Sequence, residues 1–174
     1  LLLLTGKLDA PGCGFAPLAE ENNDQGAVEM GTVTELLPGA HPIASDRERE
    51  RIAKQWNSDL PTGSGASLIE MLKRANAGSL KGMFIVGENP VGSLPAGIHA
   101  EASLRHLDLL VCQELFLTET AALAHVVLPA ASSLEKHGTF TNTEGHVQAV
   151  RPSIEPVGES RPDWEIFSAL SILL

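Results

Sequence analysis

Residues 83–90, MFIVGENP, and residues 107–114, LDLLVCQE, decide how this chain is expected to fold. Each stretch is an apolar run that ends in polar side chains, and a helical segment separates them. An apolar strand, a turn that contains glycine, a helix and a second apolar strand predict a βαβ unit with parallel strands. Ligands of such units bind outside the carboxyl ends of the strands, where a turn can meet phosphate and a carboxylate can meet a ribose or a base. The sequence therefore indicates a nucleotide-type site at one edge of a sheet.

The same alternation of helices and strands extends on both sides of this unit. We expect helices over residues 67–77, 97–106 and 118–124, and strands over residues 83–87, 108–113 and 125–129. Short, continuous apolar strands are typical of a parallel sheet with both faces covered. The pattern predicts an α/β fold with an open, doubly wound, mostly parallel sheet of Rossmann-like type.

The flanking regions have a different character. We expect the end of an apolar helix at residues 1–5, an irregular stretch at residues 9–40, an exposed helix at residues 45–57 capped by Ser45 or Asp46, a hairpin or extended loop at residues 132–148, and a last helix with Asp163 as its N-cap. Both ends of the chain are expected to be buried helical segments of a larger polypeptide. Residues 1–66 are then the end of a preceding domain with its connecting segment, and residues 67–174 are a partial α/β domain.

Composition restricts the class of ligand. The 174 residues carry a formal net charge of -10, which argues against nucleic acid as a partner because nucleic acid requires a basic face. An anionic cofactor is still compatible, since backbone N–H groups can hold phosphate. Cys13 and Cys112 form no CxxC motif, the histidines have no metal-ligand spacing, and GxSxG is absent, so neither a cysteine metal site nor a Ser-His-Asp hydrolase is indicated. The run Leu1–Leu4 is too short to span a membrane.

Polar side chains at or near the predicted strand ends are the candidate ligand contacts. They are Asn89, Gln113, Glu114, Lys136 and Asp163. Asparagine offers both a donor and an acceptor, a carboxylate accepts from ribose hydroxyls, and lysine meets phosphate as a point charge. Each also has an ordinary structural interpretation: a strand-to-helix turn for Asn89, a polar strand end for Gln113 and Glu114, a surface pair with Glu135 for Lys136, and a helix cap for Asp163.

Several segments in this order resemble the molybdopterin oxidoreductase superfamily. They are LLLLTGKLDAPGCGFAPL, ENNDQGAVEMG, FIVGENP, the stretch from DLLVCQE to TEGHVQ, and IEPVGESRPDWEI. The match is to an internal part of the large subunit. Two members of the family are similar. One is the formate dehydrogenase alpha subunit, which shares NNDQGA at residues 22–27. The other is the large iron–sulfur subunit of NADH-quinone oxidoreductase (complex I), and TEGHVQ at residues 143–148 resembles the form of the motif in that subunit more closely. The second motif favours the complex I type slightly.

The resemblance implies a molybdopterin guanine dinucleotide cofactor with molybdenum or tungsten in the full-length protein. Asn89, Gln113, Glu114, Lys136 and Asp163 match cofactor-contacting positions of the family, Lys136 through the motif E-K-x-G. The whole enzyme is expected to pass electrons between the metal centre and iron–sulfur clusters. Its expected partners are other domains of the same subunit and other subunits of a cytoplasmic electron-transfer complex, which is peripheral to the inner membrane. Neither nucleic acid binding nor direct membrane insertion is expected.

Three departures leave alternatives open. Gln113 stands where the family often has serine or a similar small residue, and the metal-ligating Cys or selenocysteine and the iron–sulfur cysteines are not in this stretch. Many complex I subunits of this type keep the fold without molybdenum. The main alternative is therefore a non-catalytic structural module of a respiratory complex that keeps the fold and binds no cofactor. An NAD enzyme is less well supported because GxGxxG is missing after the first strand.

Overall fold

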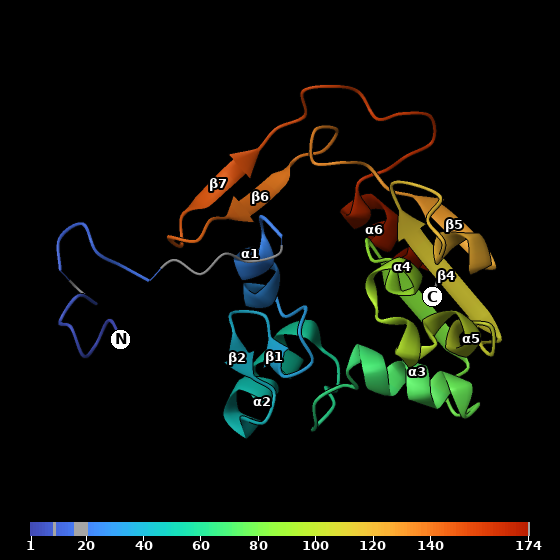
Figure 1. The fold of residues 1–174 in the computed structure, drawn as a ribbon, viewed down its shortest axis with the longest axis horizontal. Coiled ribbons are helices and arrows are strands. Elements are labelled where there is room, and N and C mark those ends of the chain that lie inside the picture. Colours follow the sequence, from blue (N-terminus) through green and yellow to red (C-terminus); the bar gives the residue numbers. More distant parts are fainter. Residues whose placement is uncertain (9, 16–20, 174) are drawn as a thin grey trace. The chain divides into compact units, whose positions relative to one another are not determined.

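A computed structural model of the chain describes residues 1–8, 10–15 and 21–173. The chain divides into two compact units (Figure 1). The first unit is Leu1–Ser64 with Thr139–Ala149, and the second is Gly65–Gly138 with Val150–Leu174.

The second unit is built on a parallel sheet of three strands in the order β3-β4-β5. The strands are β3 (Gly82–Val86), β4 (Leu109–Glu114) and β5 (Val126–Pro129). Val86 lies opposite Gln113, and Glu114 lies opposite Pro129, so the carboxyl ends of all three strands meet at one edge. The α/β fold with a parallel sheet that the sequence predicts is confirmed, and each strand begins and ends within about one residue of its expected position.

Short helices connect and cover these strands. They are α3 (Leu68–Asn76), α4 (Pro90–Ser93), the 3-10 turn η1 (Ala96–Ile98), α5 (Ala100–Leu104), the 3-10 turn η2 (Ala121–Leu123) and α6 (Asp163–Leu173). The predicted helix over residues 67–77 is confirmed, and the Ser67 hydroxyl caps it by accepting from the Glu70 N–H at 3.3 Å. The single helix predicted over residues 97–106 is wrong in extent. Gly97 lies in η1, and His99 adopts a left-handed conformation with φ 53°, so the regular helix begins only at Ala100.

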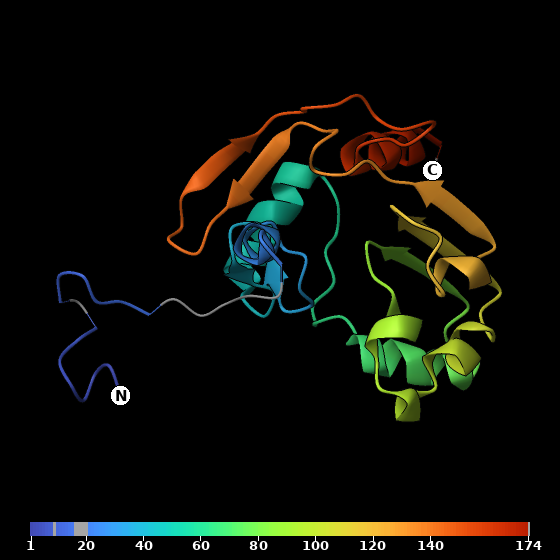
Figure 2. The ribbon, with the colours of Figure 1, turned by 45° about the horizontal axis from the view of Figure 1, so that its top comes forward.

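The core of the second unit lies between the sheet and the pair α3 and α5 (Figure 2). The members that are at most 2% exposed are Leu72, Ala75, Leu104, Leu110, Cys112 and Ala121. Apolar positions of α3 and α5 supply one side of this layer, and the inward side chains of β3 and β4 supply the other. Burial of this apolar surface is the main stabilising contribution to the unit.

The opposite face of the sheet is only partly covered. Along β3, Ile85 is 7% exposed, whereas Phe84 and Val86 are 39% and 42% exposed. The prediction that both faces are buried is therefore wrong for this strand. α6 reaches this face, where the ring centroid of Phe167 lies 5.6 Å from that of Phe84. Strand alternation sends every second side chain to this side, and one helix does not cover them all.

The first unit contains small elements. They are α1 (Asp24–Glu29), β1 (Leu36–Leu37), β2 (His41–Pro42), α2 (Asp46–Trp56), and most of the pair β6 (Gly138–Thr141) and β7 (Val147–Val150). The predicted helix at residues 45–57 is confirmed, with Ser45 as its cap, and the hairpin predicted within residues 132–148 is confirmed as β6 and β7. The prediction of an irregular stretch at residues 9–40 is wrong in part, because α1 and β1 are regular and the loop between them is hydrogen-bonded. Residues 9 and 16–20 of that stretch lie outside the described residues. Residues 2–6 form hydrogen-bonded turns rather than the predicted end of a helix.

Within the ranges described above, no helix combines the length and the apolar character needed to cross a membrane.

Candidate functional site at the carboxyl edge of the sheet

The carboxyl edge of the β3-β4-β5 sheet collects residues that the sequence indicates as ligand contacts. Gly87 follows β3 directly with φ 61°, and its N–H donates to the Gln113 carbonyl at 2.9 Å. A Cβ placed on Gly87 would meet no atom within 4 Å, so the turn after β3 is open on that side. This backbone conformation favours glycine and leaves space for close approach by another molecule.

Gln113, Asp163 and Lys136 form one connected cluster at this edge. The Gln113 Nε2 donates to Asp163 Oδ1 at 2.6 Å, and the Lys136 Nζ donates to Asp163 Oδ2 at 2.5 Å. Gln113 is fully buried, and the side chains of Lys136 and Asp163 are 23% and 36% exposed. The structure thus brings together three of the candidate residues from β4, the loop after β5, and α6. We call them the Gln113–Asp163–Lys136 cluster.

The structure assigns Asp163 and Lys136 roles other than their ordinary structural interpretations. Asp163 is the first residue of α6, and the Pro162 carbonyl begins the helical hydrogen bonds, so the N-cap prediction for Asp163 is wrong. Its carboxylate is bound by Gln113 and Lys136 instead. Lys136 pairs with Asp163 rather than with Glu135, whose carboxylate accepts from backbone N–H groups.

The Gln113 side chain carries an unsatisfied acceptor. Its Oε1 atom is buried and has no hydrogen-bond donor among the residues that the structure describes. A buried polar atom without a partner is unfavourable, and such atoms occur where a ligand or another group completes the site. The cluster therefore presents a carboxylate, an unpaired amide oxygen and an ammonium group at one position.

Asn89 lies at the same edge but belongs to a separate network. Its Oδ1 accepts from the Thr120 N–H at 3.2 Å and from the Thr120 hydroxyl at 2.7 Å, while its Nδ2 donates to Glu119 Oε2 at 2.8 Å. The N–H of Glu119 itself and the Asn89 amide lower the pKa of the Glu119 carboxyl. Neither Thr120 nor Glu119 was expected at the site from the sequence. Their local signal is the polar triplet TET at residues 118–120, shortly before the predicted third strand.

Glu114 is adjacent to Gln113 in sequence but points to the other face of the sheet, because neighbouring strand residues alternate. Its Oε1 accepts from the Leu115 N–H at 2.8 Å. Burial, and to a smaller extent the Glu114 charge, raise the pKa of the Cys112 thiol. Gln113 and Glu114 therefore approach the edge from two sides and are not a contiguous pair.

Glu135 holds the loop that carries Lys136, a role that no sequence motif indicates. Glu135 is 8% exposed, and its two carboxylate oxygens accept from the Ser132 N–H at 2.7 Å and the Val157 N–H at 2.9 Å. These hydrogen bonds, that from Ser132 first, lower the pKa of the Glu135 carboxyl. The carboxylate connects two irregular segments of the second unit and thereby restricts where Lys136 can lie.

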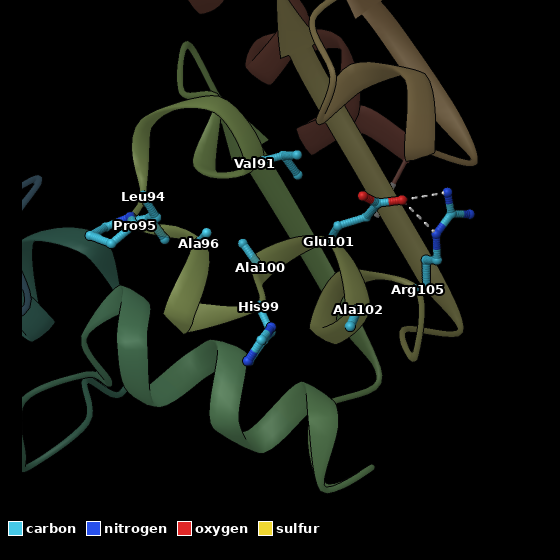
Figure 3. Close-up of a pocket in the computed structure, with 9 residues that line it drawn as sticks. All are labelled: Val91, Leu94, Pro95, Ala96, His99, Ala100, Glu101, Ala102 and Arg105. Carbon is cyan, nitrogen blue, oxygen red and sulfur yellow. Dashed lines mark hydrogen bonds and ion pairs between the residues drawn. The ribbon is translucent and has the colours of Figure 1, made fainter.

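A hollow of about 440 Å³ lies elsewhere in the second unit, on the α4–η1–α5 side (Figure 3). Its lining includes Val91, Leu94, His99, Glu101 and Arg105, and none of the candidate ligand contacts. Glu101 and Arg105 bind each other at 2.8 Å, so their charges are already paired with one another. The strand ends, rather than this hollow, therefore hold the polar groups suited to ligand binding. Nor do three His, Cys, Asp or Glu side chains converge as a metal site anywhere in the described ranges.

Comparison with known proteins supplies the family. The family model for molybdopterin oxidoreductase matches residues 1–172. The chain is 42% identical over 167 residues to a probable oxidoreductase, YjgC, of Bacillus subtilis, covering 95% of the chain and 17% of that protein. It is 42% identical over 171 residues to the F420-dependent formate dehydrogenase subunit alpha of Methanocaldococcus jannaschii, covering 98% of the chain and 25% of that protein. A putative formate dehydrogenase of Staphylococcus haemolyticus is 40% identical over 172 residues, covering 98% of the chain and 17% of that protein.

A solved structure agrees with the fold. Acetylene hydratase from Pelobacter acetylenicus superposes with a TM-score of 0.55 at 25% sequence identity, over 63% of this chain and 16% of that one. The chain thus spans about a fifth of the length of the relatives named here. The resemblance seen in the sequence is confirmed by the match over nearly the whole chain, and the chain belongs to the molybdopterin oxidoreductase family.

Proposed function

We propose that this chain is part of a formate dehydrogenase-type oxidoreductase, in which the second unit contributes one binding edge for a molybdopterin guanine dinucleotide. The observation that carries the proposal is the unsatisfied Gln113 Oε1 beside the Asp163 carboxylate and the Lys136 ammonium group. The names of two relatives support the reaction class: one is an F420-dependent formate dehydrogenase subunit alpha and another is a putative formate dehydrogenase.

The chemistry of the cluster fits a guanine nucleotide. A guanine edge presents N–H donors next to a carbonyl acceptor, and phosphates present only acceptors. Asp163 and Gln113 Oε1 can accept from the base, and Lys136 can donate to a carbonyl or a phosphate oxygen. Glu114 and Asn89 lie at the same edge and complete the proposed contact set. Asn89 contributes the amide N–H that does not bind Glu119. When bound, the cofactor would supply the redox chemistry, while these residues hold and orient it.

The fold by itself does not select the reaction, because a structural relative of this chain is named a hydratase. A full-length relative of the formate dehydrogenase alpha type is named as a subunit, so we propose further subunits of an electron-transfer complex as partners. One sequence motif, TEGHVQ at residues 143–148, favours the large iron–sulfur subunit of NADH-quinone oxidoreductase as the second candidate. Formate-dependent reduction of an electron acceptor by the full-length protein separates the two.

The binding edge is tested in the full-length protein by measuring pterin dinucleotide per polypeptide after acid oxidation, using its fluorescence. We expect Asp163→Ala and Lys136→Ala each to lower cofactor content roughly tenfold when cofactor supply is limiting, because each removes a hydrogen bond that involves a charge. The control is Glu70→Gln, which weakens the 2.9 Å ion pair with Arg74 on α3, a helix that holds none of the candidate contacts. Wild-type cofactor content in both cluster variants would reject the proposed site.

A further inference from the structure

Thr120 connects two segments that are far apart in the sequence. It is fully buried in the stretch between β4 and η2. Its hydroxyl donates to Asn89 Oδ1 at 2.7 Å and accepts from the Val91 N–H at 3.1 Å, and its own N–H donates to the same Asn89 oxygen at 3.2 Å. One residue thus ties the segment before β5 to the turn after β3.

We propose that Thr120 is a positioning residue that orients the Asn89 amide toward the ligand edge. The inference rests on the proposed function, because it assigns Asn89 a contact with the bound dinucleotide. Two donors from Thr120 require that the atom facing them be the amide oxygen, since the NH₂ group cannot accept. The amide nitrogen must then face the other way, where it meets Glu119 Oε2 at 2.8 Å.

This orientation leaves one N–H of Asn89 for a ligand. An amide NH₂ has two hydrogens, and among the described residues Glu119 is the acceptor for Nδ2. Gly92 leaves room for the amide on the other side, since a Cβ at that position would lie 2.4 Å from Asn89 Nδ2. The Asn89 amide is therefore held between Thr120 and Glu119, and the two donors of Thr120 fix the side on which its oxygen lies.

Removal of the hydroxyl while the shape is kept tests this role. In Thr120→Val the Val91 N–H loses its acceptor and Asn89 loses its stronger donor. The amide is then held only by the Thr120 N–H and by Glu119, so its position is less firmly fixed. We expect cofactor content of the full-length protein to fall about fivefold under limiting supply, and Thr120→Ser to restore it to near the wild-type level. Thr118→Val is the matched control: the Thr118 hydroxyl accepts from the Ala121 N–H at 3.2 Å, in the same segment.

A double-mutant cycle with Asn89→Ala separates positioning from general stability. If Thr120 acts through Asn89, then Thr120→Val adds no further loss of cofactor in the Asn89→Ala background. A loss that adds fully to that of Asn89→Ala, or a loss equal to that of Thr118→Val, would overturn the inference. Wild-type cofactor content in Asp163→Ala and Lys136→Ala is a different outcome: the proposed function itself then fails, and the inference about Thr120 fails with it.

Discussion

Gln113 is buried at the end of β4, yet only one of its two amide atoms has a partner in the described structure. The sequence could indicate Gln113, Lys136 and Asp163 as candidates because each follows or precedes a regular element in a polar context. It could not predict that they bind one another, since Asp163 lies 50 residues from Gln113 and 27 from Lys136. At this scale the chemistry of each side chain is local, whereas its partners are set by the fold.

Glu135 gives a pH-dependent prediction at the residue scale. Its native pKa is held below the ordinary value of 4.5 by backbone N–H groups, Ser132 first. The unfolded chain therefore binds a proton at higher pH than the native protein, so the carboxylate stabilises the fold fully above pH 4.5. This contribution is lost as pH falls through the lowered native pKa. We expect the melting temperature of wild type to exceed that of Glu135→Gln near neutral pH, with a gap that narrows below pH 4.5.

Thermal unfolding of both proteins across acidic pH checks this expectation. Glutamine keeps the size of the side chain but has one acceptor oxygen, so it cannot receive both the Ser132 and the Val157 N–H groups as the carboxylate does. A gap in melting temperature that stays constant down to about pH 3 would contradict the linkage argument.

At the scale of elements, local signals succeeded where capping residues and periodicity agreed. α2 and α3 begin directly after Ser45 and Ser67, whose hydroxyls accept from the N–H groups of Glu48 and Glu70. The prediction for the stretch from α4 to α5 failed because its regular segments are only a few residues long. The periodicity of residues 97–106 did not reveal that His99, between η1 and α5, has a left-handed conformation. Nucleation of a helix is costly, so such short segments depend on packing rather than on propensity.

The pairing of β4 with β5 supplies a prediction at this scale. His125 donates its backbone N–H to the Leu110 carbonyl at 2.8 Å, and its Nδ1 accepts from the Leu110 N–H at 2.9 Å. The imidazole thus replaces a backbone acceptor just before β5 begins. Because Leu110 is fully buried, His125→Leu leaves its N–H unpaired, and we expect a loss of about 1–3 kcal/mol in the free energy of unfolding.

Urea unfolding of His125→Leu and His125→Asn measures that cost. The asparagine oxygen occupies a similar position to Nδ1 and can still accept, so His125→Asn is expected to lose less stability than His125→Leu. Equal stability of wild type and His125→Leu would show that the Leu110 N–H does not depend on the imidazole.

For the whole molecule, the exposed apolar surface is the most consequential property. Phe84, Val86, Leu109 and Val126 in the sheet are 39% to 49% exposed, and Phe116 and Leu117 in the loop after β4 are each 76% exposed. Extensive exposed apolar surface of this kind marks a site of interaction with other protein surface. The net charge of -10 opposes association but acts over a short range at physiological salt.

We therefore expect the isolated chain to self-associate. Sedimentation equilibrium should give an apparent mass above 18.4 kDa that rises with protein concentration. Replacement of Phe116 and Leu117 by glutamate should shift the chain toward the monomer, because it charges the most exposed apolar loop. A monomer at every concentration for the unmodified chain would contradict the expectation.

The sequence by itself determined the three strands of the parallel sheet, the capped helices α2 and α3, the family, and the identity of the polar residues at the strand ends. Those properties depend on periodicity, turn chemistry and motifs within a few residues of one another. The tertiary structure alone decided that Asp163 binds Gln113 and Lys136, that Thr120 holds Asn89, and that one face of β3 is open. Each of these depends on packing between segments far apart in the chain, and no local pattern encodes which distant group satisfies a buried donor or acceptor.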